Sequence, residues 1–175
     1  NLFDTKIFFL SLHLPTLVGE EKNLESNKLT KTQSDILIHV LRIPEDQIHA
    51  YTVDRLASEL RQYYLLQVIS QIKRVEEYWY NMNTEYKLVF ILAGDFNFHH
   101  MTKENLSKKG EQILLEDSGF KCVKIDGSTR PGGRLIDNIW MKGIDNYKEV
   151  ELDKDTLEEI YQISDHAPVI GEISL

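Results

Sequence analysis

Leu-Val-Phe-Ile-Leu-Ala-Gly-Asp-Phe-Asn, residues 88–97, is the stretch that decides the fold of this chain. Its apolar run is continuous and of strand length, which indicates a buried strand. The run stops at Gly94 and is followed by Asp95 and Asn97. Residues two apart in an extended segment point to the same side, so the carboxylate and the carboxamide are expected to project together. Such a pair can position a water, a metal or a phosphate oxygen, and the same residue types also form ordinary turns.

Length and composition describe one ordinary globular domain. The chain has 175 residues, of which 42% are hydrophobic and 27% charged, enough to bury a real core. The net charge of −8 argues against a broad, sequence-independent nucleic-acid clamp, but not against an enzyme with a local basic groove. The single cysteine, Cys122, excludes an internal disulfide and favours a reducing, intracellular compartment such as the nucleus or cytoplasm. No apolar run approaches the roughly 18 residues of a membrane span, so no membrane association is expected.

The rest of the chain alternates strand-like and helix-like patterns. Runs rich in branched and aromatic residues predict strands at 6–14, 120–125, 135–141, 147–152 and 169–175. Apolar residues at helical spacing predict helices at 33–42, 53–83, 103–117 and 153–160. Residues 18–31 are polar and unpatterned, which is typical of an exposed loop. This alternation predicts a single layered α/β domain over residues 1–175.

Polar side chains gather where three predicted strands meet loops. Asp95 and Asn97 follow the central strand, Asp137 lies in Leu-Ile-Asp-Asn-Ile-Trp, and Asp165 and His166 precede the last strand. Loops mounted on a rigid scaffold commonly carry chemistry. Carboxylates supply the oxygen ligands that Mg²⁺ prefers, and a histidine held by a carboxylate can hydrogen-bond or protonate phosphate oxygens. The set therefore indicates metal-assisted attack on a phosphate ester, although an Asp-His pair taken alone is also an ordinary surface pair.

Four motifs, in chain order, resemble those of one known family. Gly94-Asp95-Phe96-Asn97, Ile136-Asp137-Asn138-Ile139 and Ser164-Asp165-His166 are similar to the motifs of the endonuclease/exonuclease/phosphatase superfamily, whose fold is the deoxyribonuclease I-like sandwich. Ser11-Leu12-His13-Leu14 resembles the family's strand that ends in a His-containing motif. The resemblance implies a layered α/β sandwich of that type, with a long inserted connection at about 18–54.

The resemblance also implies roles for the matching residues. Asp95 would activate or position the attacking water, and Asn97 would orient that water and the scissile phosphate. Asp137 would hold His166, whose imidazolium would stabilise the charge that develops on the phosphate. His13 would contact the phosphate or assist the leaving group.

The metal site implied by the resemblance is incomplete. Asp165 would serve it, with Mg²⁺ or Mn²⁺ as the cofactor. Family members also carry an N-terminal strand ending in Asn and then a Glu metal ligand, and residues 1–175 hold no match to either. The chain is therefore expected to be the C-terminal portion of a longer enzyme, or a catalytically inactive relative that serves as a binding or structural module. In a third interpretation, a partner chain or an upstream segment completes the sheet, because an unpaired edge invites pairing.

The predicted substrate is nucleic acid. The Gly-Asp-Phe-Asn form and the compact spacing of the motifs resemble the nuclease branches of the family. Basic residues near the predicted site could contact a phosphate backbone, or could be ordinary solvated charges: Arg130, Arg134, Lys103, Lys108 and Lys109. The sequence thus predicts a metal-dependent phosphodiesterase, most simply a nuclease.

Overall fold

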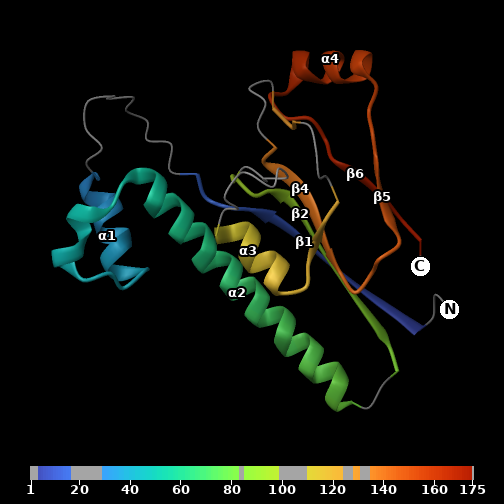
Figure 1. The fold of residues 1–175 in the computed structure, drawn as a ribbon, viewed down its shortest axis with the longest axis horizontal. Coiled ribbons are helices and arrows are strands. Elements are labelled where there is room, and N and C mark those ends of the chain that lie inside the picture. The colour runs from blue at the N-terminus through green and yellow to red at the C-terminus, as the bar shows by residue number, and fades with distance from the viewer. Residues whose placement is uncertain are drawn as a thin grey trace.

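The computed structural model describes residues 4–16, 29–82, 85–98, 110–123, 128–130 and 135–174. Within these ranges the chain forms a four-stranded mixed sheet, a two-stranded sheet and several helices (Figure 1). The predicted α/β class is confirmed. The predicted loop at 18–31 falls largely, and the first half of the predicted helix at 103–117 falls entirely, outside the described residues.

The four-stranded sheet has the order β1-β2-β4-β3. Its strands are β1 (Thr5–His13), β2 (Lys87–Asp95), β4 (Asp137–Lys142) and β3 (Lys121–Cys122). β2 is parallel to β1 and antiparallel to β4, and β3 is antiparallel to β4. The register places His13 of β1 opposite Asp95 of β2, and Asp95 opposite Asp137 of β4. Three polar residues far apart in the sequence therefore lie side by side where β1 and β2 end and β4 begins.

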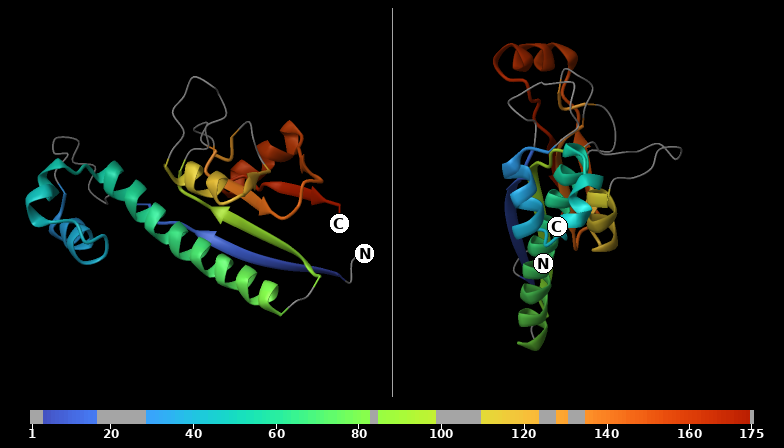
Figure 2. Two further views of the ribbon diagram at one scale, coloured as in Figure 1. Left: turned by 60° about the horizontal axis from the view of Figure 1, so that its bottom comes forward. Right: turned by 90° about the vertical axis from the view of Figure 1, so that its left-hand side faces the viewer.

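β2 is apolar from Leu88 to Ala93 because both of its faces are covered. On one side Phe90 and Leu92 are buried against Leu65 and Ile72 of α2 (Val53–Asn81). On the other side Val89 is buried in a layer shared with Met141 and with residues of the second sheet. In Figures 1 and 2, β1 and β2 run between α2 and that second sheet.

The second sheet pairs β5 (Tyr147–Val150) with β6 (Ile170–Ile173) in antiparallel register. Tyr147 and Ile173 pack into the apolar layer against the main sheet. This cover does not extend over β1, where Ile7 and Phe9 remain 46% and 65% exposed. Among the described residues β1 pairs only with β2, so its other edge is open.

The helices follow from local signals. α2 begins at Thr52, whose side chain accepts the Arg55 N–H, and α1 (Lys31–His39) begins at a capping box between Thr30 and Gln33. The short 3-10 helix η2 (Glu45–Ala50) lies between them. α3 (Gly110–Asp117) packs beside α2 and is joined to it by an ion pair of Arg61 with the fully buried Glu111, at 2.9 Å. None of the helices in the described ranges has the length and apolar character needed to cross a membrane.

The predicted elements agree with the structure except at their ends. Of the strand predicted at 120–125, the residues described (120–123) form a strand over Lys121–Cys122, and the helix predicted at 153–160 continues as α4 (Lys154–Ile163). α4 projects away from both sheets in Figures 1 and 2. After α3 the chain turns at Gly119, whose φ of +85° lies in the left-handed region.

Candidate functional site

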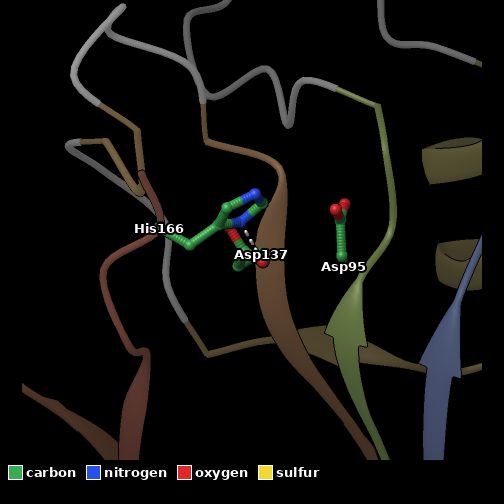
Figure 3. A group of neighbouring side chains, drawn as sticks. All are labelled: Asp95, Asp137 and His166. Carbon is green, nitrogen blue, oxygen red and sulfur yellow. Dashed lines mark hydrogen bonds and ion pairs between the residues drawn. The ribbon is translucent and has the colours of Figure 1, made fainter. Parts of the chain in front are cut away.

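Asp95, Asp137 and His166 meet at the end of the main sheet (Figure 3). Asp95 is the last residue of β2 and Asp137 the first of β4, while His166 comes from the segment between α4 and β6. One nitrogen or carboxylate oxygen from each residue lies within 4.8 Å of the others, and all three residues are half-buried. The pairing of β2 with β4 positions the two carboxylates, and the return of the chain toward β6 adds the imidazole.

The Asp137 carboxylate binds one specific nitrogen of His166. Nδ1 of His166 lies 2.8 Å from Oδ2 and 3.0 Å from Oδ1 of Asp137. Because a carboxylate accepts, this contact places a proton on Nδ1 and fixes the orientation of the ring. Nε2 then becomes the nitrogen available to a third group. The sequence-based expectation that Asp137 would hold His166 matches this geometry.

Asn97 lies near Asp95, but not in the way the sequence predicted. β2 ends at Asp95, and Asn97 has a φ of +51°, in the left-handed region that Asn tolerates. The expectation that both side chains project from one extended strand is therefore wrong. Instead, the Asn97 backbone N–H donates to Oδ1 of Asp95 at 2.8 Å, and its side-chain Nδ2 donates to the Leu14 carbonyl at 2.7 Å. Asn97 thus orients the Asp95 carboxylate and ties the site to the end of β1.

Asp165 lies beside the cluster and is bound by Arg130. The Arg130 guanidinium donates to Oδ2 of Asp165, and this hydrogen bond is the main reason why the pKa of the Asp165 carboxyl is lowered. The other oxygen of Asp165 lies 3.8 Å from Nε2 of His166. The structure therefore brings Arg130 and Asp165 to the rim of the site, whereas the group with metal-ligand spacing among the described residues consists of Asp95, Asp137 and His166.

His13 ends β1 one strand away from Asp95. Register partners in neighbouring strands point to the same side of a sheet, so His13, Asp95 and Asp137 share the face on which β5 and β6 pack. His13 is exposed. Arg134 and the three predicted phosphate-contacting lysines, Lys103, Lys108 and Lys109, lie outside the described residues.

The sequence did not reveal the roles of two residues, Gly94 and Thr129, at the site. Gly94 allows β1 and β2 to approach: it has a φ of +143°, and a Cβ there would lie 1.9 Å from the Leu12 carbonyl oxygen. The glycine ending an apolar run was visible in the sequence, but the close approach was not. Thr129 is buried, and its hydroxyl accepts the backbone N–H groups of Ile136 and Asp137, each at 3.1 Å. No pattern in the sequence pointed to Thr129.

The donor set is compatible with a hard divalent cation. Mg²⁺ is commonly bound by one or two carboxylates, with water and substrate oxygens completing its shell. The opposed carboxylates of Asp95 and Asp137 provide such oxygens, and the imidazole offers only Nε2 because Asp137 takes Nδ1.

Comparisons of this chain with protein-family models, with curated proteins and with solved structures find no match.

Proposed function

We propose that this chain carries the hydrolytic site of a metal-dependent phosphodiesterase, a nuclease that acts on nucleic-acid phosphodiester bonds. The observation that carries the proposal is the convergence of Asp95, Asp137 and His166, with the imidazole held through Nδ1. Like charges directly opposite one another in neighbouring strands destabilise a sheet. A purely structural strand end does not need two opposed carboxylates, so the arrangement favours a chemical role.

The roles follow from the atoms each residue leaves available. Asp95 receives the Asn97 N–H at Oδ1, so its other oxygen can accept a proton from a water that attacks phosphorus. His166 presents Nε2, which in the imidazolium form donates its N–H to a phosphate oxygen and stabilises the charge that develops there. His13, on the same face as Asp95, is assigned to the phosphate or to the leaving group.

The cofactor we assign to this site is Mg²⁺ or Mn²⁺. Asp95 supplies a carboxylate for it, with Asp137 or Asp165 as the second. When bound, the ion would neutralise charge on the phosphate and polarise its oxygens. The missing Asn and Glu of the family pattern would have to come from an upstream segment or a partner chain.

Arg130 supports nucleic acid as the substrate. Its guanidinium lies at the rim of the site beside Asp165, with 34% of the side chain exposed. An arginine there can contact the phosphate groups of a nucleic-acid backbone. Arg134 is assigned the same role. With a net charge of −8, attraction for a polyanion would depend on local positive groups such as this rim and a bound cation.

One observation favours a second candidate function, that of a non-catalytic module in a larger assembly. β1 is a nine-residue strand whose outer edge is open among the described residues, and Ile7 and Phe9 stand exposed on its face. A long apolar edge strand is a ready site for pairing with another strand. A partner chain or an upstream segment would complete the sheet there.

A chromogenic phosphodiester such as bis(p-nitrophenyl) phosphate separates the two functions. Hydrolysis with Mg²⁺ or Mn²⁺, abolished by EDTA and by Asp95→Asn or His166→Ala, is the expected result for the enzyme. Asp145→Asn is the matched control, because Asp145 is an exposed aspartate that pairs with Lys121 away from the site. A folded chain that releases no product with either metal would refute independent catalysis.

A further inference from the structure

Thr129 connects the two backbone segments that carry Asp137 and His166. Its side chain accepts the N–H groups of Ile136 and Asp137, each at 3.1 Å, where β4 begins. Its backbone carbonyl accepts the N–H of Ala167, the residue after His166, at 2.9 Å. One residue therefore hydrogen-bonds both chain segments whose side chains meet in the Asp137–His166 pair.

The environment of Thr129 makes these contacts rigid. Thr129 is 1% exposed and Ala167 is 4% exposed, so water does not compete for either hydrogen bond. On its two sides, Ser128 Oγ accepts the Arg130 N–H at 3.1 Å, and the Arg130 guanidinium binds Asp165. Residues 128–130 therefore contact the start of β4 on one side and residues 165–167 on the other.

We propose that Thr129 is a positioning residue that sets the separation of Asp137 and His166 and thereby selects the Nδ1–H tautomer of the imidazole. Asp137 is the first residue of its strand, at the end of the ladder with β2, and His166 lies outside regular structure, so this ladder alone does not set the separation of the two side chains. A hydrogen bond of 2.8 Å between them tolerates only a small displacement of either backbone. Thr129 hydrogen-bonds the backbone beside both residues and so holds the two segments at a fixed separation.

The catalytic consequence rests on the proposed function, whereas the tautomer does not. In the Nδ1–H form, Nε2 carries the free lone pair. When Nε2 is also protonated, the imidazolium donates Nε2–H to a phosphate oxygen while Asp137 keeps Nδ1–H. If the two segments separate, the imidazole loses its carboxylate partner and can take the other tautomer, in which Nε2 carries the proton. A purely structural threonine would affect stability but would leave the tautomer unchanged.

The test compares Thr129→Val, which keeps the shape and removes the acceptor, with Thr129→Ser, which keeps the acceptor. Long-range ¹H–¹⁵N correlation spectra identify the tautomer of His166 at a pH where the ring is neutral. We expect the Nδ1–H form to dominate in the wild type and in Thr129→Ser. We expect Thr129→Val to lower the ratio of Nδ1–H to Nε2–H at least threefold. Asp137→Asn, which removes the carboxylate itself, is the positive control.

Two further readouts complete the test. In the wild type, the amides of Asp137 and Ala167 should be protected from hydrogen exchange to a similar degree; an unprotected amide at either position would overturn the proposal even if Thr129→Val does not fold.

With bis(p-nitrophenyl) phosphate, Thr129→Val should lower kcat at least tenfold, with KM changed less than twofold and activity restored in Thr129→Ser. A folded Thr129→Val with the wild-type tautomer refutes the positioning role. A shifted tautomer without hydrolysis by the wild type would retain that role and refute the proposed function.

Discussion

The opposed carboxylates of Asp95 and Asp137 lead to a prediction that links stability with function. Their closest cluster atoms lie within 4.8 Å of one another. At that distance two unit charges repel by about 0.9 kcal/mol in bulk water and by about 3.5 kcal/mol at an effective dielectric constant of about 20. Because both residues are half-buried and His166 contacts Asp137, we take about 1 kcal/mol as the repulsion that remains.

Asp95→Asn removes this repulsion with little change in shape. The carboxamide oxygen can still accept the Asn97 N–H. We expect the variant to be more stable than the wild type by about 1 kcal/mol in EDTA, which corresponds to a rise in Tm of about 2–4 °C for a chain of this size. The same variant should lose hydrolysis, because it removes the carboxylate that accepts the proton of the attacking water. A gain in stability with a loss of activity is the usual trade-off at a functional site.

Thermal unfolding in EDTA and in saturating Mg²⁺ measures both effects. Mg²⁺ should raise the Tm of the wild type, since a ligand that binds only the folded state stabilises it, and should raise that of Asp95→Asn much less. Asp145→Asn is the control and should gain no stability, because it removes the charge that pairs with Lys121. An Asp95→Asn variant that is less stable than the wild type in EDTA would refute the repulsion between the two carboxylates.

Three further predictions concern other parts of the chain. Gly94→Ala should lower the free energy of unfolding by about 2–4 kcal/mol in urea titrations, because its Cβ would meet the Leu12 carbonyl at 1.9 Å and its φ is +143°; a cost no larger than that of Gly171→Ala, whose Cβ would meet only side chains, would contradict the close approach. The pKa of Asp165 is lowered by Arg130, so the stability difference between the wild type and Arg130→Gln should be full above about pH 5 and vanish as the carboxyl is protonated in acid; a difference that grows in acid would have the wrong sign. Phe9→Glu should change the free energy of unfolding by less than about 0.5 kcal/mol, since Phe9 is 65% exposed, but should reduce strand pairing at the open edge. If the wild type self-associates and Phe9→Glu scatters light to the same degree, the open edge of β1 is not the contact.

Periodicity predicted most of the described fold because it reports burial directly. The apolar run that begins at Leu88 forms β2, a central strand covered on both faces, and the amphipathic pattern after residue 53 is the long helix α2. Element ends were less accurate, since they depend on caps and ladders. α1 begins earlier than predicted because Thr30 and Gln33 form a capping box.

The sequence predicted which residues form the site, but not how their side chains are arranged. Motifs that end strands pointed to Asp95, Asp137 and His166, and the register of β2 with β4 brings the first two together. The left-handed turn at Asn97 and the pairing of Asp165 with Arg130 depend on contacts between distant segments. Thr129 acts through a buried hydroxyl, and a lone threonine between glycines and charged residues carries no periodic signal.

The most direct measurement of the central claim is cleavage of end-labelled single- and double-stranded DNA and RNA by the purified chain, with Mg²⁺, with Mn²⁺ and with EDTA. The account predicts metal-dependent cleavage of at least one of these substrates that His166→Ala abolishes and Asp145→Asn retains. Cleavage that persists at the wild-type rate in His166→Ala, or a folded chain that leaves all four substrates intact with either metal, would contradict it.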